Sequence, residues 1–301
     1  MSREVCRGRI GRVGVWWSAL GRRPAQEERA IVRELEEFGY PAFWFGEANS
    51  NKEAFAHAGI LLAATERIMI LTGIASIYAR DAVAMKNGAF ALAEAYPERF
   101  GLGIGVSHAP MVEARGRAYE KPLPAMRGYL DDYDAADYGP PAPAHAPALL
   151  LAALRPAMLQ LARDRSDGAH PYLTTPRHTA RARELLGPSP ILAPEQGFVL
   201  EEDPVAARAI ARAHLSLYLK LPNYRASWLE EGFTDEDVAG EGSDRLVDAL
   251  VAWGDADAIV RRVREHLDAG ADHVCIQPVA QDIERGLAEL RTLAPALRAL
   301  T

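Results

Sequence analysis

Cysteine is scarce in this chain, with two residues among 301, Cys6 and Cys275. Two thiols so far apart in the sequence provide neither a disulfide framework nor the clustered ligands of a zinc site. They fit a protein that is kept in a reducing compartment. Residues 1–5 contain no part of an apolar signal-peptide core, so we expect a cytoplasmic protein rather than a secreted one.

Long hydrophobic runs and blocks of positive charge are also missing. The longest apolar run, residues 146–154, contains Pro147 and is far shorter than the roughly 20 residues that a membrane-spanning helix needs. Lys and Arg number 34 against 41 Asp and Glu, which gives a net charge of −7. A mildly acidic chain without a basic stretch is a poor partner for nucleic acid. We therefore expect a protein that contacts neither membrane nor nucleic acid and binds small molecules.

Two common kinds of catalytic motif are absent as well. The sequence has no pair of histidines four residues apart with an intervening glutamate, and no clustered carboxylates, so we predict no metal site. It has no Gly-x-Ser-x-Gly turn, which argues against a serine nucleophile of the hydrolase type. What remains favours an organic cofactor that is held largely by backbone contacts.

Short apolar runs alternate with amphipathic stretches along the whole chain. The apolar runs end in Gly, Ser, Thr or acidic residues and predict eight strands, at residues 12–17, 42–45, 68–72, 100–106, 149–153, 168–173, 191–200 and 273–277. The stretches between them predict helices at residues 24–39, 54–64, 81–95, 156–163, 176–186, 204–221, 255–268 and 280–300.

Strands that alternate with helices of this size pair in parallel. Eight such units in about 300 residues fit a closed (β/α)₈ barrel better than an open doubly wound sheet. We therefore predict an α/β fold in which residues 1–301 form a single TIM-barrel domain. Residues 131–148, rich in Pro and Ala, and residues 223–245 do not fit one unit. We expect these two segments to be insertions at the carboxyl-terminal face that line a substrate pocket, with Tyr133, Tyr138, Tyr224, Trp228 and Phe233 as candidate contacts or as packing residues.

The active site of such a barrel lies at the carboxyl ends of its strands. This rule selects a short set of residues, namely Glu47, residues 72–76, residues 105–108, Leu154 with Arg155, residues 170–172, and Glu195 with Gln196. Within this set Gly101, Gly103 and Gly105 alternate inside a predicted strand instead of opening a helix, which argues against a dinucleotide-binding loop. Alternating glycines in a strand indicate that another backbone or a flat ligand approaches closely.

Several of these segments together resemble a known family. They are residues 43–47 (Phe-Trp-Phe-Gly-Glu), 70–75 (Ile-Leu-Thr-Gly-Ile-Ala), 96–105 (Tyr-Pro-Glu-Arg-Phe-Gly-Leu-Gly-Ile-Gly), 167–169 and 272–276. In order and spacing the chain resembles the bacterial-luciferase-like barrel superfamily, and within it the oxidoreductases that depend on the deazaflavin coenzyme F420. The resemblance covers nearly the whole chain and implies hydride transfer between that coenzyme and a small organic substrate.

The resemblance also implies roles for individual residues. A cis peptide bond would join Gly73 and Ile74 behind one face of the coenzyme ring. Glu47 would be the acidic residue beside the coenzyme, although Ala48 stands where the family usually has His. His108 would donate or accept a proton during hydride transfer, as a neutral imidazole can. The catalytic candidates are therefore His108 and Glu47, and the candidates for coenzyme binding are Glu47, Gly73, Ile74, Ser76, Gly105, Ser107, Leu154, Arg155, His170 and Tyr172.

Alternative interpretations remain for several residues and for the function. Trp16 and Trp17 form either a wall for substrate or part of the core, and Arg80 either pairs with Glu47 or lies in solvent. His108 is either catalytic or a histidine at the rim. The first alternative function is an FMN-dependent luciferase-like monooxygenase, and the second is a cofactor-binding barrel without turnover. The family resemblance further implies a homodimer.

Overall fold

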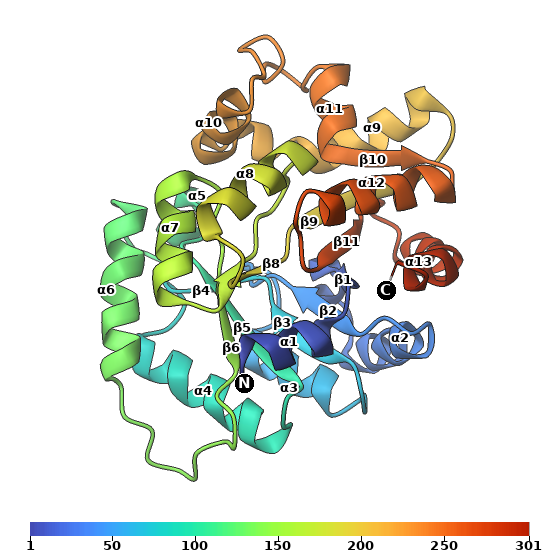
Figure 1. Ribbon diagram of the computed structural model, residues 1–301. Helices are drawn as coiled ribbons and strands as arrows, with labels where there is room; N and C mark the ends of the chain where they lie inside the picture. Colours follow the sequence, from blue (N-terminus) through green and yellow to red (C-terminus); the bar gives the residue numbers. More distant parts are fainter. Residues whose placement is uncertain (301) are drawn as a thin grey trace.

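The structure is a computed structural model that describes residues 1–300, and it contains one parallel sheet surrounded by helices (Figure 1). All strand pairs within the sheet are parallel. This confirms the α/β class with parallel pairing. The strands are β1 (Val13–Trp16), β2 (Ala42–Phe45), β3 (Met69–Thr72), β4 (Ala75–Ser76), β5 (Phe100–Gly105), β6 (Ala148–Leu151), β7 (Gly168–Ala169), β8 (Ile191–Leu192), β9 (Glu195–Leu200), β10 (Val251–Gly254) and β11 (Val274–Pro278).

The helices follow most strands, as the alternating pattern predicts. Several begin at a side chain that caps the first turn: Asp81, Thr175, Asp203 and Asp255 each accept a hydrogen bond from a backbone N–H of the helix that follows. The helices are α1 (Arg3–Ile10), η1 (Ser18–Arg22), α2 (Ala25–Glu37), α3 (Ala54–Leu62), α4 (Ala82–Ala95), α5 (Ala109–Glu113), α6 (Pro122–Ala135), α7 (Pro156–Arg165), α8 (Pro176–Leu186), α9 (Pro204–Leu215), η2 (Tyr218–Lys220), α10 (Pro222–Glu230), α11 (Asp244–Leu250), α12 (Ala256–Asp268) and α13 (Ile283–Arg298).

The prediction of eight strands is correct only in part. The structure adds β4 and β10, and the strand predicted at 191–200 is divided into β8 and β9 around Ala193 and Pro194. The strand predicted at 168–173 is reduced to β7, because Leu173 has a positive φ of 53° and the chain turns there. Pro171 donates no hydrogen bond to a sheet, which also shortens this strand.

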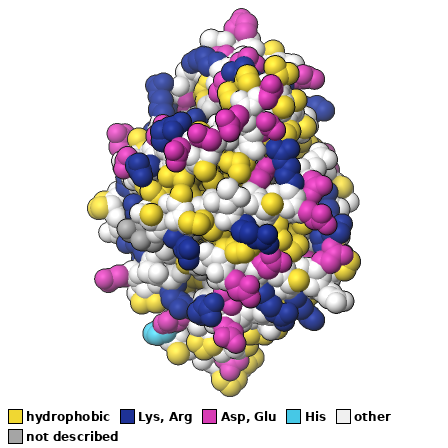
Figure 2. Space-filling model, turned by 90° about the vertical axis from the view of Figure 1, so that its right-hand side faces the viewer, with side chains coloured by type: hydrophobic (Ala, Val, Ile, Leu, Met, Phe, Trp, Pro, Cys, Tyr) yellow, Lys and Arg dark blue, Asp and Glu magenta, His cyan; other side chains and the backbone are white. Residues whose placement is uncertain are grey.

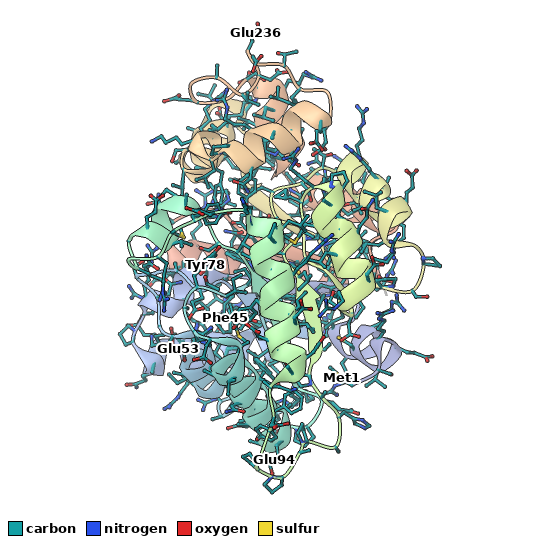
Figure 3. The ribbon with its side chains drawn as sticks, turned by 90° about the vertical axis from the view of Figure 1, so that its left-hand side faces the viewer. Met1, Phe45, Glu53, Tyr78, Glu94 and Glu236 are labelled. Atoms are coloured by element: carbon teal, nitrogen blue, oxygen red, sulfur yellow. The ribbon has the colours of Figure 1, made fainter. Side chains whose placement is uncertain are left out.

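Three helical segments differ from the prediction. Helix α1 was not expected at all, and the segment predicted as a loop at 131–148 begins within α6, which ends at Ala135. The long helix predicted at 204–221 is α9 followed by the short turn η2. Within the expected insertion at 223–245, α10 is helical, and α11 follows it before β10. Figure 3 shows this region, with Glu236 at its tip, at the end of the molecule opposite to Glu94 of α4.

The strand order is β10-β9-β11-β1-β2-β3-β5-β6-β7-β8, with β4 paired to β5. Strand β8 ends this order on one side, and only Ala193 and Pro194 separate it from β9, which is the second strand from the other side. Side chains on one face of the sheet meet in a single buried cluster that reaches from β8 to β11 and contains Trp16, Trp44, Leu71, Leu150, Ile191 and Cys275. The sheet therefore curves so strongly that one face encloses a core of its own.

Helix α1 packs against one end of this enclosed core. Its two buried residues, Cys6 and Ile10, belong to the same cluster as the inward-facing strand residues. Alternate strand residues such as Val13, Val15 and Phe43 face outward and form the larger core beneath the helices. Outside these cores, acidic and basic side chains are interspersed over the face shown in Figure 2.

The glycines of β5 bring it close to the segment that follows β3. A Cβ atom built on Gly103 would lie 2.1 Å from the backbone oxygen of Thr72, and one on Gly105 would lie 2.8 Å from the Ile74 side chain. The sequence left open whether another backbone or a flat ligand approaches these glycines. In the structure the backbone of Thr72 lies against Gly103. The close approach allows Ala75 and Ser76 to pair with β5 as β4.

Candidate functional site

A cavity of about 860 Å³ opens at the carboxyl ends of the strands. Its wall is built from the residues that directly follow β1, β2, β3, β5, β6, β7 and β11, and from the segment between α9 and α10. A parallel sheet that curves on itself brings all these strand ends to one face. The location therefore agrees with the rule that was used to select site residues from the sequence.

Nine of the eleven different residues predicted for the site line this cavity. They are Glu47, Gly73, Ile74, Ser107, His108, Leu154, Arg155, His170 and Tyr172. Proximity does not assign a role, so the catalytic and coenzyme-binding roles of these residues stay predictions.

Ser76 and Gly105 are not part of the cavity wall, and their contact with a coenzyme stays a prediction. Ser76 is 3% exposed and lies in β4, where its backbone N–H donates to Glu47 at 2.9 Å. Gly105 lies in β5 behind the side chain of Ile74. Both residues therefore support the cavity wall from behind.

The peptide bond between Gly73 and Ile74 is cis, as the family resemblance implies. The backbone oxygen of Gly73 accepts a hydrogen bond from the indole Nε1 of Trp16 at 2.8 Å, and that of Ile74 accepts one from the N–H of Glu47 at 2.9 Å. A Cβ atom at position 73 would lie 2.8 Å from Trp16 Nε1 and 2.9 Å from His170 Nε2. Glycine is required here because the bulge is held closely from two sides.

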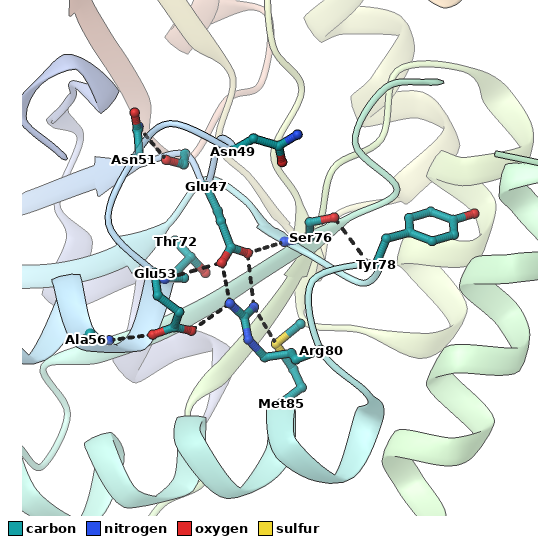
Figure 4. A network of polar contacts seen from close by, with 12 residues as sticks. Glu47, Asn49, Asn51, Glu53, Ala56, Thr72, Ser76, Tyr78, Arg80 and Met85 are labelled. Atoms are coloured by element: carbon teal, nitrogen blue, oxygen red, sulfur yellow. Dashed lines mark hydrogen bonds and ion pairs between the residues drawn. The ribbon is translucent and has the colours of Figure 1, made fainter. Parts of the chain in front are cut away.

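Glu47 is the centre of a buried ion-pair network (Figure 4). Its carboxylate accepts hydrogen bonds from both terminal nitrogens of Arg80, and Arg80 also contacts Glu53 at 2.6 Å. Burial alone would lower the pKa of Arg80, but the hydrogen bonds and charges of Glu47 and Glu53 raise it above its ordinary value. Of the two positions open to Arg80, pairing with Glu47 is therefore the correct one.

His170 lies beneath the Gly73–Ile74 bulge in a fixed orientation. Its ring stacks on Trp44, with 4.8 Å between the ring centres, and its Nδ1 lies 2.7 Å from the backbone oxygen of Ala193. The Nδ1 atom must carry the proton to make that contact, so Nε2 is an acceptor. Burial lowers the pKa of His170 to about 4, and its Nε2 has no hydrogen-bond partner among residues 1–300.

His108 precedes α5 and reaches an aromatic group at the inner end of the cavity. Its ring centre lies 5.6 Å from that of Tyr224 and 6.5 Å from that of Tyr218. Burial lowers the pKa of His108 below its ordinary value, so the imidazole is neutral at pH 7. Tyr218 Oη donates to Tyr172 Oη at 3.2 Å, and Tyr172 Oη donates to Gln277 Oε1 at 2.9 Å.

The charged residues of the cavity wall that lie near α7 pair with one another. Arg155, which precedes α7, contacts Glu230 of α10 at 2.8 Å, and Arg181 lies 3.6 Å from the same carboxylate. The Arg155 side chain is 55% exposed, so this pair is open to solvent. Exposed pairs of this kind contribute little to stability and exchange partners readily.

Of the two segments that were expected to line a substrate pocket, one lines the cavity and the other does not. No residue of the segment 131–148 lies in the cavity wall, because the chain between α6 and β6 returns to the amino ends of the strands. The segment 223–245 does contribute, through Asn223, Tyr224 and Glu230. Of the aromatic residues proposed from the sequence, Tyr224 therefore lines the cavity, whereas Tyr133, Tyr138, Trp228 and Phe233 do not.

The cavity also contains residues that sequence reasoning missed. Gln277, His214 and Tyr218 line it. Trp16 and Trp17, for which the sequence left open a wall for substrate or a place in the core, line it and are also buried. His214 and Tyr218 are four residues apart, a spacing that places two side chains on one face of a helix. That spacing is the only signal in the sequence that could have identified them.

Among residues 1–300, no group of three or more His, Cys, Asp or Glu side chains is placed to hold a metal ion. None of the helices in this part of the chain combines the length and hydrophobicity that crossing a bilayer requires.

Comparisons with known proteins agree with this geometry. The model of the luciferase-like monooxygenase family matches residues 12–273. The chain is 22% identical over 294 residues to a 5,10-methylenetetrahydromethanopterin reductase of Methanolobus tindarius, with 84% of this chain and 90% of that protein covered. An F420-dependent secondary alcohol dehydrogenase in complex with an F420-acetone adduct has a TM-score of 0.70, 17% identity, and coverage of 95% of this chain and 99% of that one. The oxygenating constituent of a Baeyer-Villiger monooxygenase of Pseudomonas putida in complex with FMN has a TM-score of 0.70, 14% identity, and coverage of 95% and 97%.

The fold is parallel α/β with a cavity at the carboxyl ends of its strands. Because the family model spans most of the sequence, the chain belongs to the luciferase-like monooxygenase family. Membership in this family supports an oxidoreductase.

Proposed function

We propose that the chain transfers a hydride between coenzyme F420, bound in the cavity, and a small organic substrate. The observation that carries the proposal is the bulge at Gly73 and Ile74, which lines the cavity and is held by hydrogen bonds from Trp16 Nε1 and the Glu47 N–H. Two similar proteins that are named for F420 or for a pterin-linked reduction support the choice of coenzyme.

The residues around the bulge fit a flat heterocycle. Trp16 and His170 fill the space beside Gly73 on one side. On the other side the Gly73 backbone and the apolar side chain of Ile74 line the cavity. The unpartnered Nε2 of His170 supplies a buried polar atom at the same place. Nine-tenths or more of buried polar groups have partners, so an orphaned atom in a cavity wall favours a bound ligand.

The outer part of the cavity fits the anionic tail of such a coenzyme. At the amino end of α7 no side chain caps the first turn, and Pro156 has no N–H. The N–H groups of Met158 and Leu159 bond the Arg155 oxygen, which leaves that of Ala157 for an anion. Arg155 precedes this helix and lies beside Leu154 in the cavity wall. We assign the tail to these residues, with Ser107 and Tyr172 nearer the coenzyme ring, since Tyr172 packs on Trp16, which bonds the Gly73 oxygen.

Bound F420 supplies a carbon centre that carries a hydride. The protein supplies orientation, exclusion of water and proton transfer. Trp16, Trp17 and Ile74 provide apolar surface that excludes water from the reacting centre. His108, neutral at pH 7, accepts a proton when the substrate is oxidised and returns it when the substrate is reduced.

Glu47 has a different part in this proposal from the one expected. Arg80 and the Ser76 N–H already bond its carboxylate, so these oxygen atoms are held within the wall and not offered to a substrate. Its backbone N–H holds the Ile74 oxygen. We therefore propose that Glu47 positions the bulge, with His108 as the catalytic residue.

An FMN-dependent monooxygenase is the second candidate. The family description and the similar structure in complex with FMN favour it. A cofactor-binding barrel without turnover is the third, and its support is Ala48 at the position where the family usually has His.

Parallel fluorescence titrations with oxidised F420 and with FMN test the proposal. We expect F420 to bind at least tenfold more tightly than FMN, and His108→Gln to lower the rate of substrate-dependent F420 reduction by about 10–100-fold. The coenzyme Kd of this variant should stay within threefold of the wild type. Tight binding of FMN alone would overturn the proposal in favour of the monooxygenase, and F420 binding without any turnover would favour the third candidate.

Three structural details belong to the same proposal. We infer a closed (β/α)₈ barrel, since β8 and β9 are consecutive along the chain while they pair with β7 and β11. The segment from α10 to α11 would be an insertion over its carboxyl-terminal face. A homodimer, which the family resemblance implies, can be tested by sedimentation.

A further inference from the structure

The inner end of the cavity is lined by aromatic rings from separate segments of the chain. Tyr218 lies at the centre, with its ring 5.4 Å from that of Tyr172, 5.1 Å from that of Tyr224 and 5.6 Å from that of His214. His108 completes the group through its contact with Tyr224. Tyr172, Tyr218, Tyr224, His108 and His214 all belong to the cavity wall. We call these five residues the inner ring.

Within the inner ring, two tyrosine hydroxyl groups have hydrogen-bond partners and two histidine nitrogens have none. The hydroxyl groups of Tyr172 and Tyr218 bond in a chain that ends on Gln277. By contrast, Nδ1 of His108 and Nε2 of His214 are buried and have no partner within the described part of the chain. Buried polar atoms are nearly always paired. Two unpaired imidazole nitrogens in one cavity therefore indicate a ligand that completes their hydrogen bonds.

The charged residues of the cavity wall are other residues than these five, and all of them except Arg22 pair with an opposite charge. Glu47 pairs with Arg80, Arg155 and Arg181 pair with Glu230, and Arg22 bonds Asn51. Burial lowers the pKa of His108 and brings that of His214 to about 4, so neither ring carries charge at pH 7. A charged group beside the inner ring would lose its hydration without gaining an opposite charge.

We propose that the inner ring binds an uncharged ring compound that bears hydroxyl or carbonyl oxygen. The ring packs among the three tyrosines, and His108 and His214 hydrogen bond its oxygen atoms. This inference rests on the proposed function, because it names the substrate class of the same cavity. Here His214 selects the substrate, and it is a residue to which the proposed hydride transfer gives no role.

Ligand-observed NMR titrations of the purified chain without added coenzyme test this inference. The probes are phenol, toluene and benzoate, which share one ring but differ in hydrogen bonding and charge. We expect phenol to bind at least fivefold more tightly than either of the others. Toluene lacks the hydroxyl group that forms the hydrogen bond, and benzoate carries a charge that loses its hydration in the cavity. His214→Phe, and independently His108→Phe, should weaken phenol binding about fivefold and leave toluene binding unchanged.

Two controls separate binding from folding. His145→Phe replaces a histidine whose side chain is 59% exposed and lies outside the cavity, and it should leave all three affinities unchanged. His214→Phe should melt no lower than the wild type, because an unpartnered polar atom is replaced by an apolar group of similar shape. A purely structural histidine would instead show a loss of melting temperature.

Three results would overturn the inference: benzoate binding as tightly as phenol, failure of all three probes to bind, or both histidine variants retaining full affinity for phenol. Because no coenzyme is added, these results are independent of the F420 and FMN titrations. The NMR titrations can thus overturn the proposed substrate class while the coenzyme assignment stands. The coenzyme titrations can likewise overturn the choice of F420 while the substrate class stands.

Discussion

At the scale of single residues, Gly103 shows how a glycine in a strand shapes a site that it does not touch. A methyl group there would lie 2.1 Å from the Thr72 backbone oxygen. We expect Gly103→Ala to displace the Gly73–Ile74 bulge, lower stability by about 2–3 kcal/mol and weaken coenzyme binding. Gly128→Ala is the matched control, since this exposed helical glycine has open space around it and alanine there should stabilise by about 0.5–1 kcal/mol. Urea unfolding of both variants measures the difference, and equal stabilities would contradict the argument.

Trp16 has both of the roles that the sequence left open, as part of the core and as part of the cavity wall. It is 7% exposed and belongs to the enclosed core, yet its indole Nε1 bonds the Gly73 oxygen at the cavity wall. Trp16→Phe keeps most of the apolar contact and removes that hydrogen bond. We expect the Kd of the coenzyme to rise about fivefold, consistent with one hydrogen bond of roughly 1 kcal/mol. Trp253→Phe, which removes an indole bond to Asp248 outside the cavity, should leave the Kd unchanged.

At the scale of elements, Arg80 joins the loop after β2 to the amino end of α3 and to the segment after β4. Its side chain is 10% exposed and pairs with Glu47 and Glu53. Arg80→Met should leave Glu47 buried without its partner and lower stability by about 2–4 kcal/mol, since breaking a buried pair costs more than the pair contributes. Arg23→Ala breaks an exposed pair with Glu27 and should change the melting temperature little. Adding Glu47→Gln to Arg80→Met removes the unpaired buried charge and should recover part of the lost stability. No recovery would contradict the argument that the unpaired Glu47 carboxylate causes the loss.

Strand β9 contains a buried carboxyl group that makes stability depend on pH. Burial raises the pKa of Glu195 to about 8 from 4.5, although the Leu173 N–H bonds its Oε2. The folded state therefore holds a proton that the unfolded state has lost, and this contribution to stability is lost as pH rises from about 4.5 through 8. Glu195→Gln should equal the wild type near pH 4 and melt several degrees higher at pH 8.5. Glu202→Gln, at an exposed position, should follow the wild-type profile.

The elements differ in how far the sequence could predict them. Strands such as β2 and β3 are continuous apolar runs and are found at their predicted places. Strand β10 was missed because Val251 and Ala252 follow α11 directly, without the turn residues that mark a strand start. The loop position of Gly73 and Ile74 was accessible through the family resemblance, whereas His214 was not, because its role depends on how α9 meets α10 in space. Local patterns thus identify strand ends, and only tertiary packing identifies the side chains that reach across the cavity.

At the scale of the whole molecule, the amino ends and the carboxyl ends of the strands have different roles. Cys6 and Ile10 of α1 close the enclosed core at one end, while the bulge at Ile74 faces the cavity at the other. Residues at the amino ends of the strands in such folds serve stability, and those at the carboxyl ends serve function. The enclosed core between them is close-packed, so it holds the two ends in fixed relation.

This polarity can be measured with two truncations of the same side chain. Ile10 is fully buried, so Ile10→Ala should lower stability by about 2–4 kcal/mol, which corresponds to a melting temperature lower by roughly 5–15 °C. Its coenzyme Kd should stay within twofold of the wild type, because the cavity is far from α1. Ile74→Ala, at the partly exposed bulge, should lower the melting temperature less and raise the Kd about tenfold, since it removes the apolar surface behind the ring. If both variants changed the Kd equally, the enclosed core would transmit strain from one end to the other, and the division of the molecule into a stabilising end and a functional end would be wrong.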